Sequence, residues 1–516
     1  MSTSESILAP YYKRPFKRLT RRRLYFAIGG FAFLYGLFFG VTTIFLLVQL
    51  SIPLVLLALL VIWMLPETGR ASLGLLERLF FIFIAGLLCW PDYLAIAIPP
   101  IPWITVVRLV VAPLALVFLV SLSQSSKFRN ELKGILGAAP VVAKLLLAFW
   151  LVAAISVAFS ETPASSLNLL IVYTLNWFMV AVIASYVLAQ PGRMRTFAYL
   201  IWFIGIGVCI IGVLEARRGA VVWLGHIPSF LQIQVDSVQR SLAGSFRAGV
   251  GVHRVQSKFT TPLGFAEFLG CSVSFVFYIA VFGNNKYVRA MAALTVPLMI
   301  YNIIKTDSRL GMVGFSSAIL LSVLLWGVVE WKRDRNSILG PAAIFSFPAA
   351  VVVFISASFF VGRLRALIWG TGAQLDSTDA RIEQLHLGIP KILAQPWGYG
   401  VGRGGITLGY VNQAGELSID NYYLGMALDY GIIGLLIFLL MFFLLIFKSC
   451  SIIVKSREIH EDHILLGFSV ICLINFLIIK TIFSQTESHP FFFAVFGGCL
   501  ALLYRLKGRQ ARQCDR

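Results

Sequence analysis

The chain contains 516 residues, of which 59% are hydrophobic and only 13% are charged, and its mean hydropathy is +0.85. Soluble globular proteins carry roughly 25% charged residues, so this composition excludes a soluble protein and indicates an all-α polytopic membrane protein. The formal net charge of +20 does not indicate nucleic-acid binding, because most Lys and Arg residues lie in short connections, where they hold loops in the cytoplasm.

Transmembrane helices are predicted over most of the chain. A run of about 20 apolar residues spans the hydrocarbon as a helix, and the sequence predicts about fourteen such helices (12–14). The first run follows the basic segment KRPFKRLTRRR without a small-residue cleavage site, so we expect a retained anchor rather than a signal peptide. The third run is the weakest because Pro91 and Asp92 interrupt it. The runs are 25–43, 45–64, 77–94, 103–121, 140–159, 166–188, 196–214, 262–282, 288–304, 309–329, 341–360, 421–449, 463–483 and 488–505.

The basic residues also predict the topology. If the N-terminal basic cluster lies in the cytoplasm and the helices alternate, seven further segments fall inside, and each carries Lys or Arg, as the positive-inside rule requires. An even number of helices with both termini in the cytoplasm follows. The predicted regions are a basic N-terminus (1–24), N-terminal membrane helices (25–214), a first outer loop (215–261), central membrane helices (262–360), a second outer loop (361–420), C-terminal membrane helices (421–505) and a cytoplasmic tail (506–516).

The first outer loop carries an unusual positive charge. Six basic residues stand there against two acidic ones, on the side of the membrane where the topological bias disfavours them. An anionic ligand such as phosphate, bound by an Arg fork, explains this charge; contact with lipid headgroups is the alternative. The basic residues are Arg217, Arg218, Arg240, Arg247, Arg254 and Lys258.

Several predicted helices begin at the outer side with residues that cap helices. These are Thr261, Asp307 with Ser308, and Asp420 with Asn421. Helix N-termini present free N–H groups and a partial positive charge, so a bundle that gathers them favours phosphate. Ordinary capping is the alternative for each, and we favour it for Thr261. Arg309 lies near Lys305 and Asp307, and for this residue we favour a functional charge.

The second outer loop has two parts. The segment STDARIEQLHLGIPKILAQ (377–395) places apolar residues at helical spacing, which predicts an amphipathic helix on the outer surface. It is followed by PWGYGVGRGG (396–405), a glycine-rich stretch whose amides could cradle an anion. A flexible hinge is the alternative for this stretch.

Four segments, in this order, resemble the O-antigen ligase and polymerase superfamily of membrane glycosyltransferases. They are RVQSKFTTPLGFAEFL with Arg254, KTDSRLGMVGF with Ser308 and Arg309, ARIEQLHLGIPKILAQPWGYGVGRGG with Arg381, and DNYYLGMALDYGIIGLL with Asn421. The resemblance covers roughly residues 245–450 and implies a GT-C-like membrane fold. Ligases of the family place a His immediately before the Asn, whereas this chain has Asp420. The resemblance therefore favours a polymerase.

For the function, the resemblance implies the joining of undecaprenyl-diphosphate-linked oligosaccharide repeat units at the periplasmic face of a bacterial inner membrane. The product would be exopolysaccharide, capsule or O-antigen, formed with inversion at the anomeric carbon. The alternatives are an O-antigen ligase that transfers glycan to lipid A core, and a flippase for lipid-linked oligosaccharides. Expected partners are the lipid-linked donor and acceptor, membrane lipids, a flippase and a chain-length regulator, with no nucleic acid.

Arg side chains can stabilise the charge that develops on a leaving diphosphate, and we assign this role to Arg254 and Arg309. Arg247 and Arg381 are second choices for the same role. Asp420 is the candidate base for the incoming hydroxyl; a role as helix cap only is the alternative. Asn421, Ser308, His253, His386 and Arg403 are further candidates for substrate binding.

We expect no metal or other cofactor. The first outer connection, near FGVTT, contains no acidic residue, whereas many membrane glycosyltransferases of similar architecture carry acids there. No pair of Cys residues has zinc-ligand spacing with His.

Overall fold

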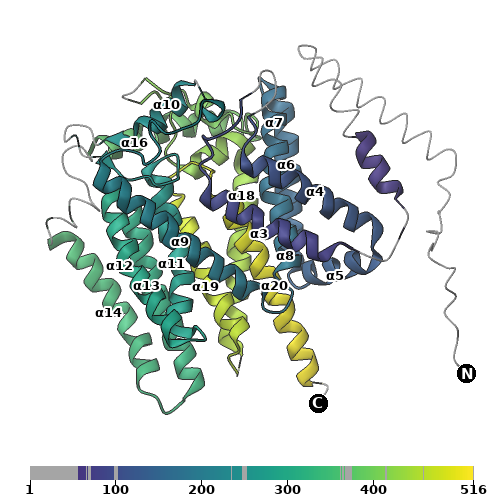
Figure 1. The fold of residues 1–516 in the computed structure, drawn as a ribbon, viewed down its shortest axis with the longest axis vertical. Helices are drawn as coiled ribbons and strands as arrows, with labels where there is room; N and C mark the ends of the chain where they lie inside the picture. The colour runs from purple at the N-terminus through teal and green to yellow at the C-terminus, as the bar shows by residue number, and fades with distance from the viewer. Residues whose placement is uncertain are drawn as a thin grey trace, which may run out of the picture.

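The computed structural model describes residues 56–514, apart from 66, 68–70, 98–102, 234, 247–250, 252, 361, 363–364, 366–374, 413–414 and 457 (Figure 1). The first predicted membrane helix and the start of the second lie outside the described residues, as does Arg247. Residues 56–64, the end of the second predicted run, are helical.

The described chain is an all-α polytopic membrane protein. Eleven of its helices are long and apolar enough to cross a membrane, and they coincide with the fourth to fourteenth predicted runs. The third run forms a 17-residue helix that ends at Cys89, just before the Pro91–Asp92 interruption. The described α-helices are α3 (Leu73–Cys89), α4 (Val106–Gln124), α5 (Ser126–Leu136), α6 (Pro140–Ser156), α7 (Pro163–Tyr173), α8 (Met179–Val187), α9 (Arg193–Arg218), α10 (Asp236–Ala243), α11 (Pro262–Phe282), α12 (Lys286–Thr306), α13 (Arg309–Arg333), α14 (Leu339–Phe360), α16 (Leu375–Ala394), α17 (Gly404–Leu408), α18 (Tyr422–Lys455), α19 (Glu461–Ile479) and α20 (His489–Cys514).

Short irregular helices and one small ribbon complete the described structure. The 3₁₀ turn η1 (Val157–Phe159) extends α6, and the π-helical turn η2 (Thr174–Phe178) joins α7 to α8 in one span. A further 3₁₀ turn, η3 (Ser229–Leu231), lies in the first long connection. Two-residue strands β1 (Ser245–Phe246) and β2 (His253–Arg254) pair antiparallel.

Helices α11, α19 and α20 form the centre of the bundle, because most of their residues are buried within the protein. Helix α14 lies at the periphery and exposes Phe345 and Phe360, as a lipid-facing helix does. Small residues let α11 and α13 approach closely at Gly270 and Gly314. The Asn475 side chain of α19 donates to both of these glycine carbonyls, at 2.8 and 2.9 Å, and so joins the three helices.

Both long connections lie at one end of the bundle, which we call the loop end. Figure 1 shows α10 and α16 at this end and the C-terminal end of α20 at the other. An ion pair between Arg240 of α10 and Glu416 joins the two connections. The first connection also packs on the α3–α4 loop, where the Trp223 indole donates to the Tyr93 hydroxyl at 3.0 Å. These contacts fix the α3–α4 loop against the bundle.

Helix α18 is interrupted one third of the way along. Gly431 has φ 73° and ψ 177°, a conformation that favours glycine. The glycine-rich segment 396–400 lies against the interruption and supplies hydrogen bonds that the helix lacks there. Three backbone bonds close the break: Tyr399 N–H to Leu428 O (2.7 Å), Gly400 N–H to Asp429 O (3.1 Å) and Ile432 N–H to Pro396 O (3.0 Å).

Candidate functional site

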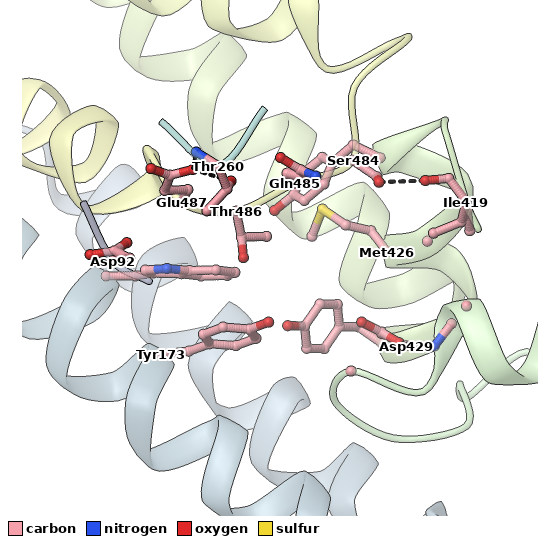
Figure 2. A pocket seen from close by; sticks show the side chains of 17 residues that line it. Asp92, Tyr173, Thr260, Ile419, Met426, Asp429, Ser484, Gln485, Thr486 and Glu487 are labelled. Carbon is pink, nitrogen blue, oxygen red and sulfur yellow. Dashed lines mark hydrogen bonds between the residues drawn. The ribbon is translucent and has the colours of Figure 1, made fainter. Parts of the chain in front are cut away.

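A cavity of about 430 Å³ opens at the loop end, lined by segments from six parts of the chain (Figure 2). Its lining combines carboxylates, phenols, one indole and several small hydroxyl or amide side chains. Among the described residues that line it there is no Lys or Arg. The lining residues are Asp92, Tyr173, Trp177, Thr260, Gly402, Gly404, Gly405, Ile419, Tyr422, Gly425, Met426, Asp429, Tyr430, Ser484, Gln485, Thr486 and Glu487.

Asp429 lines this cavity two residues before the interruption of α18 at Gly431. The N–H of Gly404 donates to Asp429 Oδ1 at 2.5 Å, and the amides of Gly402 and Arg403 also hydrogen-bond to this carboxylate. The amides of the glycine run are thus directed at a carboxylate of the protein, and the predicted binding of an external anion stays a prediction. This carboxylate lies inside a membrane helix.

The opposite side of the cavity carries Asp92 and Glu487, as Figure 2 shows. Glu487 Oε2 accepts the Thr260 hydroxyl at 2.6 Å, and Oε1 accepts from the buried Lys258 ammonium at 3.2 Å. Lys258 also donates to Leu87 O at the end of α3, at 2.9 Å. These bonds hold the α3–α4 loop, and with it Asp92, at the cavity.

Asp92 differs from the other two acids because its Oδ1 is buried without a hydrogen-bond partner among the described residues. Burial raises the pKa of Asp92 to about 6; the nearby Glu487 carboxylate adds to this shift, and Lys258 and Arg108 oppose it. The protonated and ionised forms of Asp92 are therefore both accessible near neutral pH.

The segment 480–487 supplies the polar rim of the cavity. Lys480 and Glu267 form an ion pair of 2.7 Å in which both side chains are almost completely buried. The Lys480 ammonium also donates to Gln485 O at 2.5 Å, and its carbonyl accepts the Tyr422 N–H at 3.2 Å. Ser484 donates to Ile419 O. A buried charge pair thus fixes both the rim and the start of α18.

Arg254, Ser308 and Arg309 lie together at the turn between α12 and α13. Arg254 Nε donates to Thr306 O at 3.0 Å, and its neighbour Val255 pairs with the carbonyl of Lys305 at 3.1 Å. Ser308 caps α13 by accepting the Gly311 N–H at 3.2 Å, and Arg309 is the first residue of this helix. We call Arg254 and Arg309 the arginine group.

The arginine group is linked to the cavity by a short stretch of chain. Thr260, which lines the cavity, follows Arg254 by six residues. A fully extended chain spans at most about 3.6 Å per residue, so the Cα atoms of Arg254 and Thr260 lie no more than about 22 Å apart. Neither Arg254 nor Arg309 is among the residues that line the cavity.

Asp420 lies at the edge of the cavity between two lining residues, Ile419 and Tyr422. Its carboxylate is 3.7 Å from Arg381 Nε of α16, and burial raises its pKa while Arg381 opposes the shift. The helix cap is Asn421, whose side chain accepts the N–H groups of Tyr423 and Leu424 at 2.9 and 3.2 Å. The alternative that Asp420 is itself the cap is therefore wrong, and its carboxylate is available for another role.

The remaining predicted residues lie elsewhere at the loop end. His253 Nε2 is 2.9 Å from the fully buried Glu215 carboxylate, which also accepts the Ser257 N–H at 2.6 Å. His386 lies exposed on α16. Arg403 directly precedes α17, and its guanidinium donates to Glu161 at 3.2 Å. Thr261 caps α11 by accepting the Gly264 N–H at 3.2 Å, as we expected.

Sequence reasoning missed the acids that line the cavity. In the sequence, Asp92 is predicted only as an interruption of a weak apolar run, and Glu487 is not predicted as a site residue. Asp429 carried a signal that could have been used, because an ionisable residue inside a membrane helix is rare and commonly functional. Within the described chain, no three His, Cys, Asp or Glu side chains are grouped so that they could hold a metal ion.

A family model matches part of the chain. No curated protein sequence is similar enough to the chain to extend the comparison. Residues 294–439, from α12 to the middle of α18, match the family model described as O-Antigen ligase. This segment includes Arg309, Arg381, Asp420, Asp429 and the interruption of α18 at Gly431. This match is consistent with the resemblance of the four segments to the O-antigen ligase and polymerase superfamily.

Proposed function

We propose that the protein is a polysaccharide polymerase that joins undecaprenyl-diphosphate-linked oligosaccharide repeat units at the periplasmic face of a bacterial inner membrane. The observation that carries the proposal is the contact of Arg254 with the turn that leads into Arg309, on a segment that reaches, six residues later, a cavity lined by acids and aromatic rings. Two substrates with different chemistry, an anionic diphosphate and an uncharged glycan, need two such neighbouring environments.

In this proposal the arginine group receives the diphosphate of the donor. The acceptor hydroxyl attacks the anomeric carbon, the bond from this carbon to the phosphate oxygen breaks, and the diphosphate leaves with the electron pair. Arg254 and Arg309 stabilise the charge that develops on this leaving group, and attack from the opposite face inverts the anomeric configuration. Arg381, which lies beside Asp420, is the second choice for the same role.

Asp420 takes up the proton of the attacking hydroxyl. Burial raises its pKa, which makes this carboxylate a better proton acceptor than an exposed aspartate. Asn421 holds the start of α18 in place through its cap, and so keeps the preceding Asp420 in position. No metal ion is required by this scheme, because cationic side chains stabilise the leaving group.

The match to a family described as O-Antigen ligase makes a ligase the second candidate. The acceptor distinguishes the two activities, since a ligase transfers its glycan to lipid A core and a polymerase extends another repeat unit. Asp420, in the position where ligases of the family carry His, favours the polymerase.

The test uses purified full-length protein in detergent with undecaprenyl-diphosphate-linked repeat units as the sole substrate. We expect longer glycan together with released undecaprenyl diphosphate. Arg254→Ala and Arg309→Ala should abolish product while the variants still insert and purify. Product that forms only when lipid A core is added indicates a ligase. Transfer across vesicles without any new glycosidic bond indicates a flippase and refutes the proposal.

A further inference from the structure

The cavity offers a chemistry that the diphosphate cannot use. Its three acids, Asp92, Asp429 and Glu487, present oxygen acceptors, and no described lining residue is cationic. A diphosphate has only acceptor oxygens at neutral pH and needs cations or N–H donors. The cavity therefore suits a ligand that donates many hydrogen bonds.

Aromatic side chains form the rest of the wall. Tyr173 and Trp177 stack with their ring centroids 3.9 Å apart, and Tyr422 and Tyr430 come from the upper turns of α18. The face of an aromatic ring is electronegative, so it attracts the weakly positive C–H groups on the face of a sugar ring. Acids beside aromatic rings match the alternating O–H and C–H groups of a saccharide.

Two buried polar atoms at this wall have no partner among the described residues. They are Asp92 Oδ1 and the Tyr422 hydroxyl, and the Tyr422 side chain is only 5% exposed. A buried polar atom without a hydrogen bond costs free energy unless a ligand or water satisfies it. Both residues line the cavity, so we expect a ligand that enters it to reach and satisfy these two atoms.

The cavity has the size of a small-molecule site. Its volume of about 430 Å³ falls within the range of about 300–1,000 Å³ that is usual for such sites. The Lys480–Glu267 ion pair and the glycine cradle of Asp429 hold the rim and the floor in place. The rim and the floor of the site are therefore held by contacts within the protein.

We propose that this cavity is the saccharide subsite of the protein, in which Asp92 and the Tyr422 hydroxyl hydrogen-bond the hydroxyl groups of the acceptor glycan while its diphosphate stays outside. The assignment of the bound glycan as the acceptor rests on the proposed polymerase function. The binding of a saccharide to these residues does not.

The test measures binding of two separate probes to the full-length protein in detergent. One probe is the repeat-unit oligosaccharide released from its lipid by mild acid, and the other is undecaprenyl diphosphate without sugar. We compare Asp92→Asn and Tyr422→Phe, which remove one charge or one hydroxyl at nearly constant shape. Asp236→Asn, an exposed acid on α10, is the matched control.

We expect Asp92→Asn to weaken oligosaccharide binding by about tenfold or more, and Tyr422→Phe by about fivefold, as the loss of one charged or one neutral hydrogen bond predicts. Binding of undecaprenyl diphosphate should stay within about twofold in both variants, which also shows that they are folded. Unchanged oligosaccharide binding overturns the proposal. An equal loss for both probes also overturns it, because the cavity would then hold the diphosphate.

The two proposals fail in different ways. If the wild-type protein binds the oligosaccharide through Asp92 but makes no polymer, the saccharide subsite is supported and the polymerase function is rejected. If the protein polymerises the repeat units but neither variant changes the KM for the acceptor, the polymerase function is supported and the saccharide subsite is refuted. If both proposals hold, Tyr422→Phe should raise the acceptor KM more than it lowers kcat.

Discussion

The buried ion pair between Lys480 and Glu267 allows a sharp test of how the site is held. Lys480 is 0% exposed and Glu267 1% exposed, and their charged atoms are 2.7 Å apart. Lys480→Met removes the cation and leaves Glu267 buried without its counter-charge. Breaking one partner of a buried pair costs about 3–5 kcal/mol, so we expect a loss of this size for Lys480→Met alone.

The double variant Glu267→Leu/Lys480→Met removes both charges, and so distinguishes the cost of one unpaired buried charge from the net contribution of the ion pair. Replacing both charges by apolar groups of similar volume is often neutral or stabilising, so most of the lost stability should return. The hydrogen bond from Lys480 to Gln485 O is still missing, however, and the cavity rim should be less well fixed. We therefore expect the double variant to be stable but to bind the oligosaccharide more weakly than wild type.

The assay measures the free energy of unfolding of the purified proteins in detergent. Wild type, the two single variants and the double variant together form a double-mutant cycle. Lys127→Met, which removes an exposed cation on α5, is the control and should change stability by less than about 0.5 kcal/mol. The reasoning is refuted if Lys480→Met costs less than about 1 kcal/mol, or if the double variant is no more stable than the single variants.

Three further predictions concern the cavity and α18. Gly431→Ala should destabilise the protein by about 1–3 kcal/mol and lower activity, because Gly431 has φ 73° and ψ 177° and an added Cβ would lie 2.1 Å from Pro396 O. Gly219→Ala is the control for a positive φ alone, since Gly219 has φ 68° and ψ 18° and no atom lies near the added Cβ; we expect it to cost less. Oligosaccharide binding should strengthen as the pH rises through about 6, because burial raises the pKa of Asp92 to this value and the ionised form is the stronger acceptor. Asp92→Asn should remove this pH dependence. A wild-type binding profile that is flat between pH 5 and 7 would contradict the assignment. Full polymerase activity in excess chelator is the third expectation, and an absolute requirement for Mg²⁺ would count against it.

Predictions of the membrane helices from sequence were accurate because an apolar run of sufficient length has few alternatives to a helix in lipid. The eleven candidate spans coincide with predicted runs, and the helix over 377–395 is observed as α16. The interruption of α18 was not predicted. DNYYLGMALDYGIIGLL is apolar on both sides of Gly431, and the break depends on a glycine loop that docks there from the second long connection.

Local pattern and tertiary arrangement contributed differently to the site. Cap residues and the arginine pair were readable because capping and helix starts depend on neighbours in sequence, and the structure brings Arg254 to the α12–α13 turn that carries Arg309. The cavity was not readable, since Asp92, Asp429 and Glu487 are separated by hundreds of residues or lie in different helices and loops.

By itself, the sequence determined that this is a polytopic helical membrane protein, where its loops lie along the chain, and the motifs that match the O-antigen ligase family. Hydropathy and the cost of exposing backbone to lipid act locally, so they leave a direct record in composition. Only the tertiary structure decided which acids share a cavity, that Asn421 rather than Asp420 caps α18, and that the glycine run cradles Asp429. Those outcomes depend on contacts between distant segments, which no single stretch of sequence encodes.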